Sequence, residues 1–467
     1  MQTSFTLAQL ADPDIAEADK ILRACVHCGF CTATCPTYVL LGDELDSPRG
    51  RIYLIKEMLE HDRPATVEVV KHIDRCLSCL ACMTTCPSGV HYMHLVDHAR
   101  AHIEETYRRP WPDRLMRALL AKVLPYPARF RAALTGGWLA GRLIALVSAA
   151  PAPGSRTVTR VEGQPGLVRR LIAMLRLMPA RLPARSAFEG RRVFAPQGAR
   201  KARVALLQGC AQAVLAPSIN DAAIRLLTRL GIEVVLAKGE GCCGSLVHHM
   251  GREDEALAQA RANIAAWTRE VEGEGLDAIL ITASGCGTTV KDYGFMLRND
   301  PAWSPSAARI STLAKDISEF LAVLDLDSHV IRGAVSGLTV AYQSACSLQH
   351  GQKITRQPKD LLGKCGFTVR DVPEGHLCCG SAGTYNILQP ELAKRLRDRK
   401  VENLARTGAN IIATGNIGCM TQLAPATAIP VVHTVELVDW ACGGPAPKAL
   451  DGMQKSANSS RRIAAAP

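Results

Sequence analysis

Two short runs of cysteine constrain this chain more than any other feature. The run CVHCGFCTATCP occupies residues 25–36, and CLSCLACMTTCP repeats its spacing at residues 76–87. Each run has the pattern C-x2-C-x2-C-x3-C-P, which holds [4Fe–4S] cubanes in two-cluster ferredoxins. Three thiolates from one tight turn reach three iron corners of a cube, and a cysteine from elsewhere meets the fourth corner. We therefore expect a helical N-terminal domain built around two [4Fe–4S] clusters.

On the ferredoxin precedent, each cluster takes three ligands from one run and the fourth from the other run. The first expected ligand set is Cys25, Cys28, Cys31 and Cys86. The second expected set is Cys76, Cys79, Cys82 and Cys35. Structural zinc is the alternative, but zinc sites use two C-x2-C pairs rather than four cysteines in one run.

The remaining cysteines belong mostly to an internal repeat. Cys346 lies 136 residues after Cys210, and the same offset relates the two copies of the rare word CCGS at residues 242–245 and 378–381. The last cysteine of each copy fits an offset of 133, which needs only a small change in loop length. The candidate metal or redox residues of the two copies are Cys210, Cys242, Cys243, Cys286, Cys346, Cys378, Cys379 and Cys419. Cys365 and Cys442 have no counterparts and are expected to be plain buried thiols.

Each copy has the pattern of an α/β unit. In the first copy, apolar strand-like segments at 203–210, 232–237 and 277–286 alternate with helical segments at 218–231 and 254–271. The cysteines follow the predicted strands, and in parallel α/β sheets that edge is where ligands bind. The expected fold class is thus a helical two-cluster domain followed by two duplicated α/β cysteine-rich modules.

The composition divides the chain further. Of the net charge of +12, residues 108–203 carry 20 basic against three acidic residues, so the basicity is local. Helical spacing of apolar residues at 112–124 and 166–178 predicts amphipathic helices that contact either an anionic membrane surface or a partner protein. The expected boundaries are 1–105 for the cluster domain, 106–202 for the basic connector, 203–325 and 336–445 for the modules, and 446–467 for a disordered tail.

Several functions are disfavoured by what the sequence lacks. Residues 1–20 show no signal-peptide pattern, and the longest apolar run, 143–150, is far shorter than the roughly 20 residues of a membrane span. Cysteine-rich chains without a secretion signal favour a reducing compartment and metal ligation, so we expect a cytoplasmic protein. Aromatic residues make up only 4%, and no nucleic-acid-binding motif accompanies the charge. No nucleotide fingerprint or G-x-S-x-G motif is present, so substrate chemistry is expected on a partner.

The segment SPRGR at residues 47–51 lies between the two cysteine runs. We interpret it as a turn and helix start with solvated arginines, since Ser-Pro is a common way to begin a helix. The alternative places basic side chains beside an anionic cluster or a partner surface.

Two ferredoxin runs followed by two CCG modules resemble the glycolate oxidase (glycolate dehydrogenase) iron–sulfur subunit family, as does the phrase SGCGTTVKDY at 284–293. The resemblance implies FAD-containing partner subunits that oxidise glycolate to glyoxylate, with D-lactate as a second candidate substrate. It implies that this chain passes single electrons toward a membrane acceptor such as quinone, as a peripheral protein on the cytoplasmic face of the inner membrane. One further metal or iron–sulfur centre in each module is a further expectation.

Three alternatives stay open at this point. In the first, the chain is similar to the iron–sulfur subunits for lactate or glycerol-3-phosphate oxidation. In the second, its similarity to heterodisulfide reductase subunits implies thiol/disulfide chemistry in the modules. A zinc-stabilised scaffold without a redox role is the third alternative. The family's modules end in C-x-x-C when they carry the unusual heterodisulfide reductase cluster, whereas here CGTT and CMTQ begin at Cys286 and Cys419.

Overall fold

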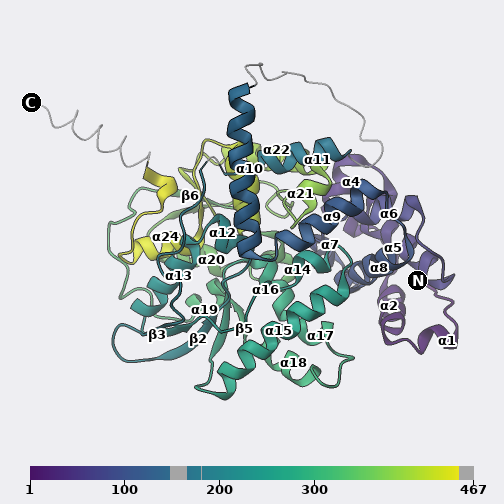
Figure 1. Ribbon diagram of the computed structural model, residues 1–467, viewed down its shortest axis with the longest axis horizontal. Helices are drawn as coiled ribbons and strands as arrows, with labels where there is room; N and C mark the ends of the chain where they lie inside the picture. Colours follow the sequence, from purple (N-terminus) through teal and green to yellow (C-terminus); the bar gives the residue numbers. More distant parts are fainter. Residues whose placement is uncertain (148–165, 180, 452–467) are drawn as a thin grey trace, which may run out of the picture.

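The computed structural model describes residues 1–147, 166–179 and 181–451 (Figure 1). The predicted disordered tail lies mostly outside these described residues. Figure 1 shows the N-terminal helices gathered at one side of the molecule in purple, with the two α/β modules making up most of the rest. A helical N-terminal domain followed by two α/β modules is therefore the fold class, as predicted.

The N-terminal domain is made of helices whose first residues are indicated by capping residues and prolines in the sequence. Asp12, Ser47 and Thr66 cap three of them, and proline occupies an early position in α2, α4 and α5. Apolar faces of these helices meet in one core that includes Leu22, Ile55, Ile73 and Leu95. The helices are α1 (Leu7–Leu10), α2 (Pro13–Ala24), α3 (Phe30–Thr34), α4 (Pro36–Leu41), η1 (Glu44–Asp46), α5 (Pro48–Glu60), α6 (Val67–Asp74), α7 (Ala81–Thr85) and α8 (Tyr92–Thr106).

The connector contains the two expected amphipathic helices, α9 (Trp111–Val123) and α11 (Leu167–Arg176), and a third, α10 (Pro127–Val147). Figure 1 shows the C-terminal end of α10 projecting from the body of the molecule. Part of the basic belt is internal, because Asp113 accepts from Arg170 at 2.5 Å and lies 3.3 Å from Arg109. The connector ends in β1 (Val193–Phe194), which pairs antiparallel with a strand of the first module.

The first module holds a five-stranded sheet in the order β1-β3-β2-β4-β5, parallel apart from β1. Apart from Arg203, the residues of its central strands are apolar and almost all buried, as expected for a sheet covered on both faces. Its elements are β2 (Ala202–Leu206), α12 (Ala211–Leu215), α13 (Ser218–Arg229), β3 (Ile232–Val235), α14 (Ser245–His248), α15 (Glu253–Glu272), β4 (Ala278–Ile281), α16 (Ser284–Lys291), α17 (Tyr293–Met296), α18 (Ser304–Leu313), β5 (Ala314–Asp316) and α19 (Ile317–Ala322).

The second module repeats this plan with a four-stranded parallel sheet in the order β7-β6-β8-β9. Its elements are β6 (Thr339–Tyr342), η2 (Ser347–Gly351), α20 (Gln357–Lys364), β7 (Thr368–Arg370), α21 (Tyr385–Leu388), α22 (Pro390–Ala405), β8 (Ile411–Thr414), α23 (Ile417–Leu423), η3 (Ala424–Ala426), β9 (Val431–His433), α24 (Thr434–Ala441) and η4 (Lys448–Leu450).

The two modules share one hydrophobic core, to which α13 and α24 both contribute. Arg225 and Arg229 on α13 both pair with the buried Asp439 on α24, at 2.7 and 3.1 Å. His433 at the end of β9 also donates to the Thr282 carbonyl of the first module at 2.8 Å. Within the described part of the chain, every helix is too short or too polar to cross a membrane.

Candidate metal centres

The two cysteine runs fold into matching loops. Within the first run, His27 and Gly29 have positive φ angles of 55° and 83°. The equivalent positions of the second run, Ser78 and Leu80, have φ angles of 48° and 63°. Only glycine adopts this left-handed conformation freely, so three of these four residues are held in an unfavourable geometry. Backbone strain of this kind persists where the surrounding structure imposes it, as in a loop that directs several side chains and amides toward one bound group.

Each loop leads into a short helix that carries the third cysteine. Cys31 lies in α3 and Cys82 lies in α7, and these two helices pack against each other. The fourth cysteine of each run ends its helix with extended backbone, as the C-cap of α3 or α7. Because the helices pack side by side, each fourth cysteine is brought toward the loop of the other run.

One cavity lies against the first loop. It encloses space that no protein atom fills and is partly open to solvent. Its lining includes Tyr92 and Arg49 as well as cysteines from both runs. The cysteines of this first cavity are Cys25, Cys28, Cys31, Cys82 and Cys86.

A second cavity, partly open to solvent, lies against the second loop. Arg51 and Tyr92 line it, so Tyr92 and Cys82 stand between the two cavities. Its cysteines are Cys35, Cys76, Cys79 and Cys82. Each cavity thus contains the four sulfurs that the ferredoxin pattern predicts for it, including one from the other run.

The donor set of these cavities fits an iron–sulfur cluster. Most of the sulfurs are shielded from water, and burial raises the pKa of the Cys79 and Cys82 thiols well above its ordinary value. Burial likewise raises the pKa of Cys31 to about 11. Buried thiolates need compensating positive charge, which metal ions supply. The Ser78 N–H points at the Cys76 sulfur at 3.5 Å, and Tyr92 Oη donates to the same sulfur at 3.7 Å.

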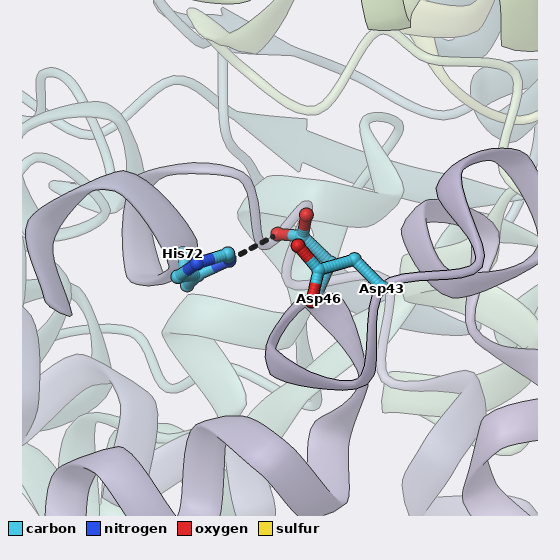
Figure 2. Close-up of side chains that lie close together, drawn as sticks. All are labelled: Asp43, Asp46 and His72. Atoms are coloured by element: carbon cyan, nitrogen blue, oxygen red, sulfur yellow. Dashed lines mark hydrogen bonds and ion pairs between the residues drawn. The ribbon is translucent and has the colours of Figure 1, made fainter. Parts of the chain in front are cut away.

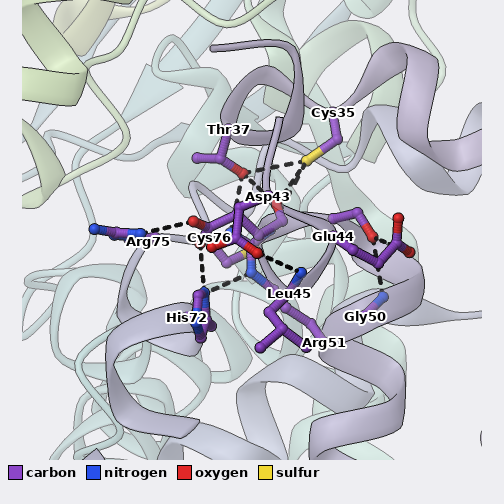
Figure 3. A network of polar contacts seen from close by, with 12 residues as sticks. Cys35, Thr37, Asp43, Glu44, Leu45, Gly50, Arg51, His72, Arg75 and Cys76 are labelled. Carbon is purple, nitrogen blue, oxygen red and sulfur yellow. Dashed lines mark hydrogen bonds and ion pairs between the residues drawn. The ribbon is translucent and has the colours of Figure 1, made fainter. Parts of the chain in front are cut away.

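A buried polar network supports the second cavity (Figure 3). Arg51 is only 1% exposed. Its guanidinium donates to the His72 carbonyl at 2.7 Å, to Thr37 Oγ1 at 3.0 Å and to the Cys35 sulfur at 3.8 Å. The interpretation of SPRGR as a helix start with solvated arginines is therefore only half right: α5 does begin there, but Arg51 turns inward. Arg51 points inward because the buried Asp46 carboxylate and the Cys35 sulfur lie within reach of its positive charge.

Asp46 is the anionic centre of that network. Its carboxylate accepts from Arg75 at 2.7 Å, from His72 Nδ1 at 3.0 Å and from Arg51 at 3.3 Å. Burial by itself would raise the pKa of Asp46, but the His72 hydrogen bond and the two arginine charges hold it below its ordinary value. Sequence reasoning missed this network, because no spacing rule brings residues 46, 51, 72 and 75 together.

Asp43, Asp46 and His72 lie close enough to suggest a metal site (Figure 2). The Asp46 oxygens, however, already face two arginines, and Asp43 Oδ1 accepts from the Leu45 amide at 3.0 Å to cap η1. A divalent cation would meet two guanidinium charges there. These three residues are therefore better explained as support for the neighbouring cysteines than as a separate metal centre.

Each α/β module gathers its four cysteines at the carboxyl edge of its sheet. In the first module the Cys242 and Cys210 sulfurs lie 3.5 Å apart. In the second module, Cys346 and Cys378 lie 3.7 Å apart, and Cys379 and Cys419 lie 3.5 Å apart. Gly244 and Gly380 follow the double cysteines with φ angles of 89° and 85°, which make the sharp turn possible. We name these four-cysteine groups the first and second thiol groups. What the cysteines of each group bind remains a prediction.

The second thiol group lies beside the second cavity. Cys79 of the cluster domain shares one apolar cluster with Cys378, and Cys346 packs against the same cluster. Tyr385 Oη donates to the Arg75 carbonyl at 3.2 Å, and Thr84 Oγ1 lies 2.8 Å from His350 Nδ1. The cluster domain and the second module are thus joined through the residues that carry their sulfurs.

Comparison with known proteins agrees with this architecture. A model described as a 4Fe-4S dicluster domain matches residues 21–90, and a model described as a cysteine-rich domain matches residues 204–291 and 340–424. A crystal structure of a hypothetical protein from Helicobacter pylori has a TM-score of 0.53 at 10% identity, covering 94% of this chain and 74% of that one, so it shares the fold.

Two relatives are informative in sequence. Lactate utilization protein A of an Exiguobacterium strain is 25% identical and covers 50% of this chain and 96% of its own. The glycolate oxidase iron–sulfur subunit of Escherichia coli K12 is 45% identical over 94% of this chain and 99% of its own length. With both domain types in place and the similarity running from end to end, the chain belongs to the glycolate oxidase iron–sulfur subunit family.

Proposed function

We propose that this protein is the electron-transfer subunit of a complex that oxidises glycolate, receiving electrons from FAD-containing partner subunits. The observation that carries the proposal is the crosswise lining of two neighbouring cavities by cysteines from both runs. Iron–sulfur clusters supply one-electron transfer when bound at such sites. The ligands would be Cys25, Cys28, Cys31 and Cys86 in the first cavity, and Cys76, Cys79, Cys82 and Cys35 in the second.

The exposure of the cysteines at the two cavities indicates the direction in which electrons would move. Cys28 is exposed, and two large apolar side chains beside it, Val26 and Phe30, are 66% and 63% exposed. This apolar patch at the first cavity is where a flavoprotein partner would dock, because exposed aromatic and aliphatic side chains are typical of interface centres. The second cavity lies deeper, with Cys35, Cys76, Cys79 and Cys82 all buried. Electrons would therefore enter at Cys28 and move inward.

The side chains of the second cavity hold positive charge and exclude water. Arg100 donates to the Cys76 carbonyl at 2.8 Å and to Ser78 Oγ at 2.6 Å, and it is buried. Arg51 and Arg100 thus place two guanidinium groups beside this site, and each is also paired with a buried carboxylate, Asp46 or Asp97. Tyr92 fills the space between the two cavities and keeps its hydroxyl on the Cys76 sulfur. Iron–sulfur clusters transfer single electrons, so the two-electron oxidation of the substrate would belong to the flavin-bearing partner.

Reconstitution with the FAD-containing subunits tests the proposal. The assay follows reduction of an artificial dye by glycolate, with D-lactate as a second substrate, and follows flavin absorbance in the same samples. In Cys28→Ser, glycolate should still bleach the flavin, whereas dye reduction should fall at least tenfold. Cys365→Ala, which removes a buried cysteine outside both runs and both thiol groups, should retain activity. Dye reduction that survives Cys28→Ser unchanged would contradict the proposal.

We further propose that the protein meets an anionic membrane surface through α11, close to a quinone-type acceptor. One face of α11 is anchored by Arg170, which is buried against Asp113. The opposite face leaves Val168, Leu171 and Leu175 exposed. Between α11 and α22 lies a groove, open to solvent, that is lined by four cationic side chains, Arg169, Arg176, Lys394 and Arg397. Arg169 pairs with Glu391, and Lys394 and Arg397 both pair with Asp398.

Apolar residues flanked by basic ones suit the boundary between lipid headgroups and acyl chains, where each basic residue adds about 1 kcal/mol. Co-sedimentation with phosphatidylglycerol vesicles tests this surface. Binding should weaken with added salt, be small for phosphatidylcholine vesicles, and fall at least tenfold in Leu171→Glu/Leu175→Glu. Leu7→Glu, at an exposed leucine of α1, is the matched control and should bind normally. Equal binding by both variants would contradict the assignment.

A further inference from the structure

The two modules can be aligned through the glycine that follows each double cysteine. A Cβ at Gly244 would lie 3.0 Å from the Ala256 carbonyl oxygen, and a Cβ at Gly380 would lie 2.5 Å from the Ala393 carbonyl oxygen. Each glycine therefore lets the cysteine loop press against the first turns of a long helix, α15 or α22. This contact equates Ala256 with Ala393. Two helical turns further along, it equates Asn263 with Lys400.

Asn263 holds the first cysteine loop with neutral hydrogen bonds. Its Nδ2 donates to the Cys242 carbonyl at 2.9 Å, and its Oδ1 accepts from the Gly241 amide at 2.8 Å. Tyr293 Oη adds a hydrogen bond to the Cys243 carbonyl at 2.8 Å. A half-buried acid, Glu240, stands two residues before the double cysteine, where it accepts from Gln208. At this position, α15 therefore offers the first thiol group a neutral amide and no cation.

Lys400 replaces the asparagine in the second module with a buried positive charge. Its side chain is 1% exposed, and its Nζ donates to the Glu374 carbonyl at 2.9 Å. Burial lowers the pKa of Lys400, and the thiols of Cys379, Cys378 and Cys419 oppose that shift. The Glu374 carboxylate is engaged elsewhere, by Arg399 Nε at 2.7 Å and Asn403 at 2.8 Å. Lys400 therefore brings a buried positive charge to the helix position from which Asn263 holds the first cysteine loop.

The two thiol groups differ in their position relative to the cluster domain as well as in the charge beside them. The second thiol group shares its apolar cluster with Cys79 of the second cavity. The equivalent cysteines of the first module, Cys242 and Cys210, share no apolar cluster with a cysteine of the cluster domain among the described residues. An electron leaving the second cavity finds the second thiol group packed directly against it.

We propose that the second thiol group, and not the first, holds a redox centre that continues the electron path, and that Lys400 is the positioning residue that stabilises its reduced form. The inference rests on the proposed electron-transfer function. One electron would reach this centre from the group ligated by Cys79 and would leave to the acceptor. The added negative charge is stabilised by a buried cation, because Coulomb interactions are weakly screened in the protein interior. Removing that cation should make the centre harder to reduce.

Redox titration of the anaerobic full-length protein, followed by EPR, tests the inference. Beyond the two signals of the cluster domain, a third reducible signal should be present, lost in Cys378→Ser and retained in Cys242→Ser. In Lys400→Met, the ratio of reduced to oxidised third centre at a fixed potential should fall about tenfold, which is about 59 mV for one electron. Lys400→Arg should restore most of the ratio, and Asn263→Met is the control for changing the same position in the first module.

The two cluster-domain signals report whether each variant is folded, and their reduction by glycolate through the flavin partner tests the proposed function in the same samples. A third signal that survives Cys378→Ser, a second thiol group that binds only zinc, or an unchanged potential in Lys400→Met would overturn the inference. The first two signals would remain under all three outcomes. Failure of glycolate to reduce those two signals would instead count against the proposed function.

Discussion

Arg51 connects the cysteine ligands to the rest of the cluster domain, and its removal should be severe. Arg51→Met removes a buried partner of Asp46 and Thr37, and the expected loss of unfolding free energy is about 3–5 kcal/mol. Arg261→Met is the matched control, because Arg261 is partly exposed and pairs with Asp300 at 2.8 Å, an interaction worth about 0–1 kcal/mol. Urea unfolding under anaerobic conditions measures both. Similar small losses in the two variants would contradict a structural role for Arg51.

Asp316 should give the stability a pH dependence. Burial raises the pKa of its carboxyl to about 6, above the unfolded value of about 4. Between these values the folded chain binds more protons than the unfolded chain, so stability falls as pH rises from about 4 to 6. Asp316→Asn keeps an acceptor for the Ser318 amide, which donates to Asp316 Oδ1 at 2.9 Å, and removes the charge.

We therefore expect Asp316→Asn to stabilise the protein by about 3 kcal/mol at pH 8 and by roughly half as much at pH 5. Urea unfolding midpoints at the two pH values, compared with the wild type, measure the difference. A gain that is the same at both pH values would show that the carboxyl does not titrate in this way.

The turn between α14 and α15 fixes the first module to the cluster domain. Gly251 has a φ of 82°, and a Cβ there would lie 2.3 Å from the Arg100 carbonyl oxygen of α8. Gly275 also has a φ of 82°, but nothing lies within 4 Å of its Cβ position. Alanine in the left-handed conformation costs about 1–2 kcal/mol.

Gly275→Ala should show only that conformational cost, whereas Gly251→Ala should lose clearly more because it also pushes α14 away from α8. Thermal unfolding and limited proteolysis between the cluster domain and the first module report the two effects. Equal losses in the two glycine variants would mean that this contact does not hold the domains together.

The elements were largely predictable because their signals are local. Buried apolar segments followed by cysteines indicate β2, β4, β6 and β8, and helical periodicity with proline or cap residues indicates α5, α9 and α11. Cys286 and Cys419 lie on the helices that follow their strands, because each strand ends a few residues before its cysteine. The strand β1 has no such signal, since two residues carry too little pattern and its pairing with β3 is long-range.

At the level of the complete chain, the cysteine spacing predicted which sulfurs come together, but not what surrounds them. The Asp46 network, the apolar contact between Cys79 and Cys378, and the hydrogen bond from Lys400 to the Glu374 carbonyl join segments with no shared periodicity. Such contacts are fixed by the packing of domains, which a single sequence does not encode in any local motif. The basic belt is a related case, because Arg109 and Arg170 are buried while Arg169 is exposed.

EPR of serine variants tests the crosswise ligation most directly, since a serine ligand perturbs only the cluster it touches. Cys86 belongs to the second run, yet it lines the first cavity with Cys28. We predict that Cys86→Ser alters the same EPR signal and midpoint potential as Cys28→Ser and leaves the other cluster signal unchanged. If Cys86→Ser instead alters the signal that Cys79→Ser alters, each run holds its own cluster and the crosswise ligation is wrong.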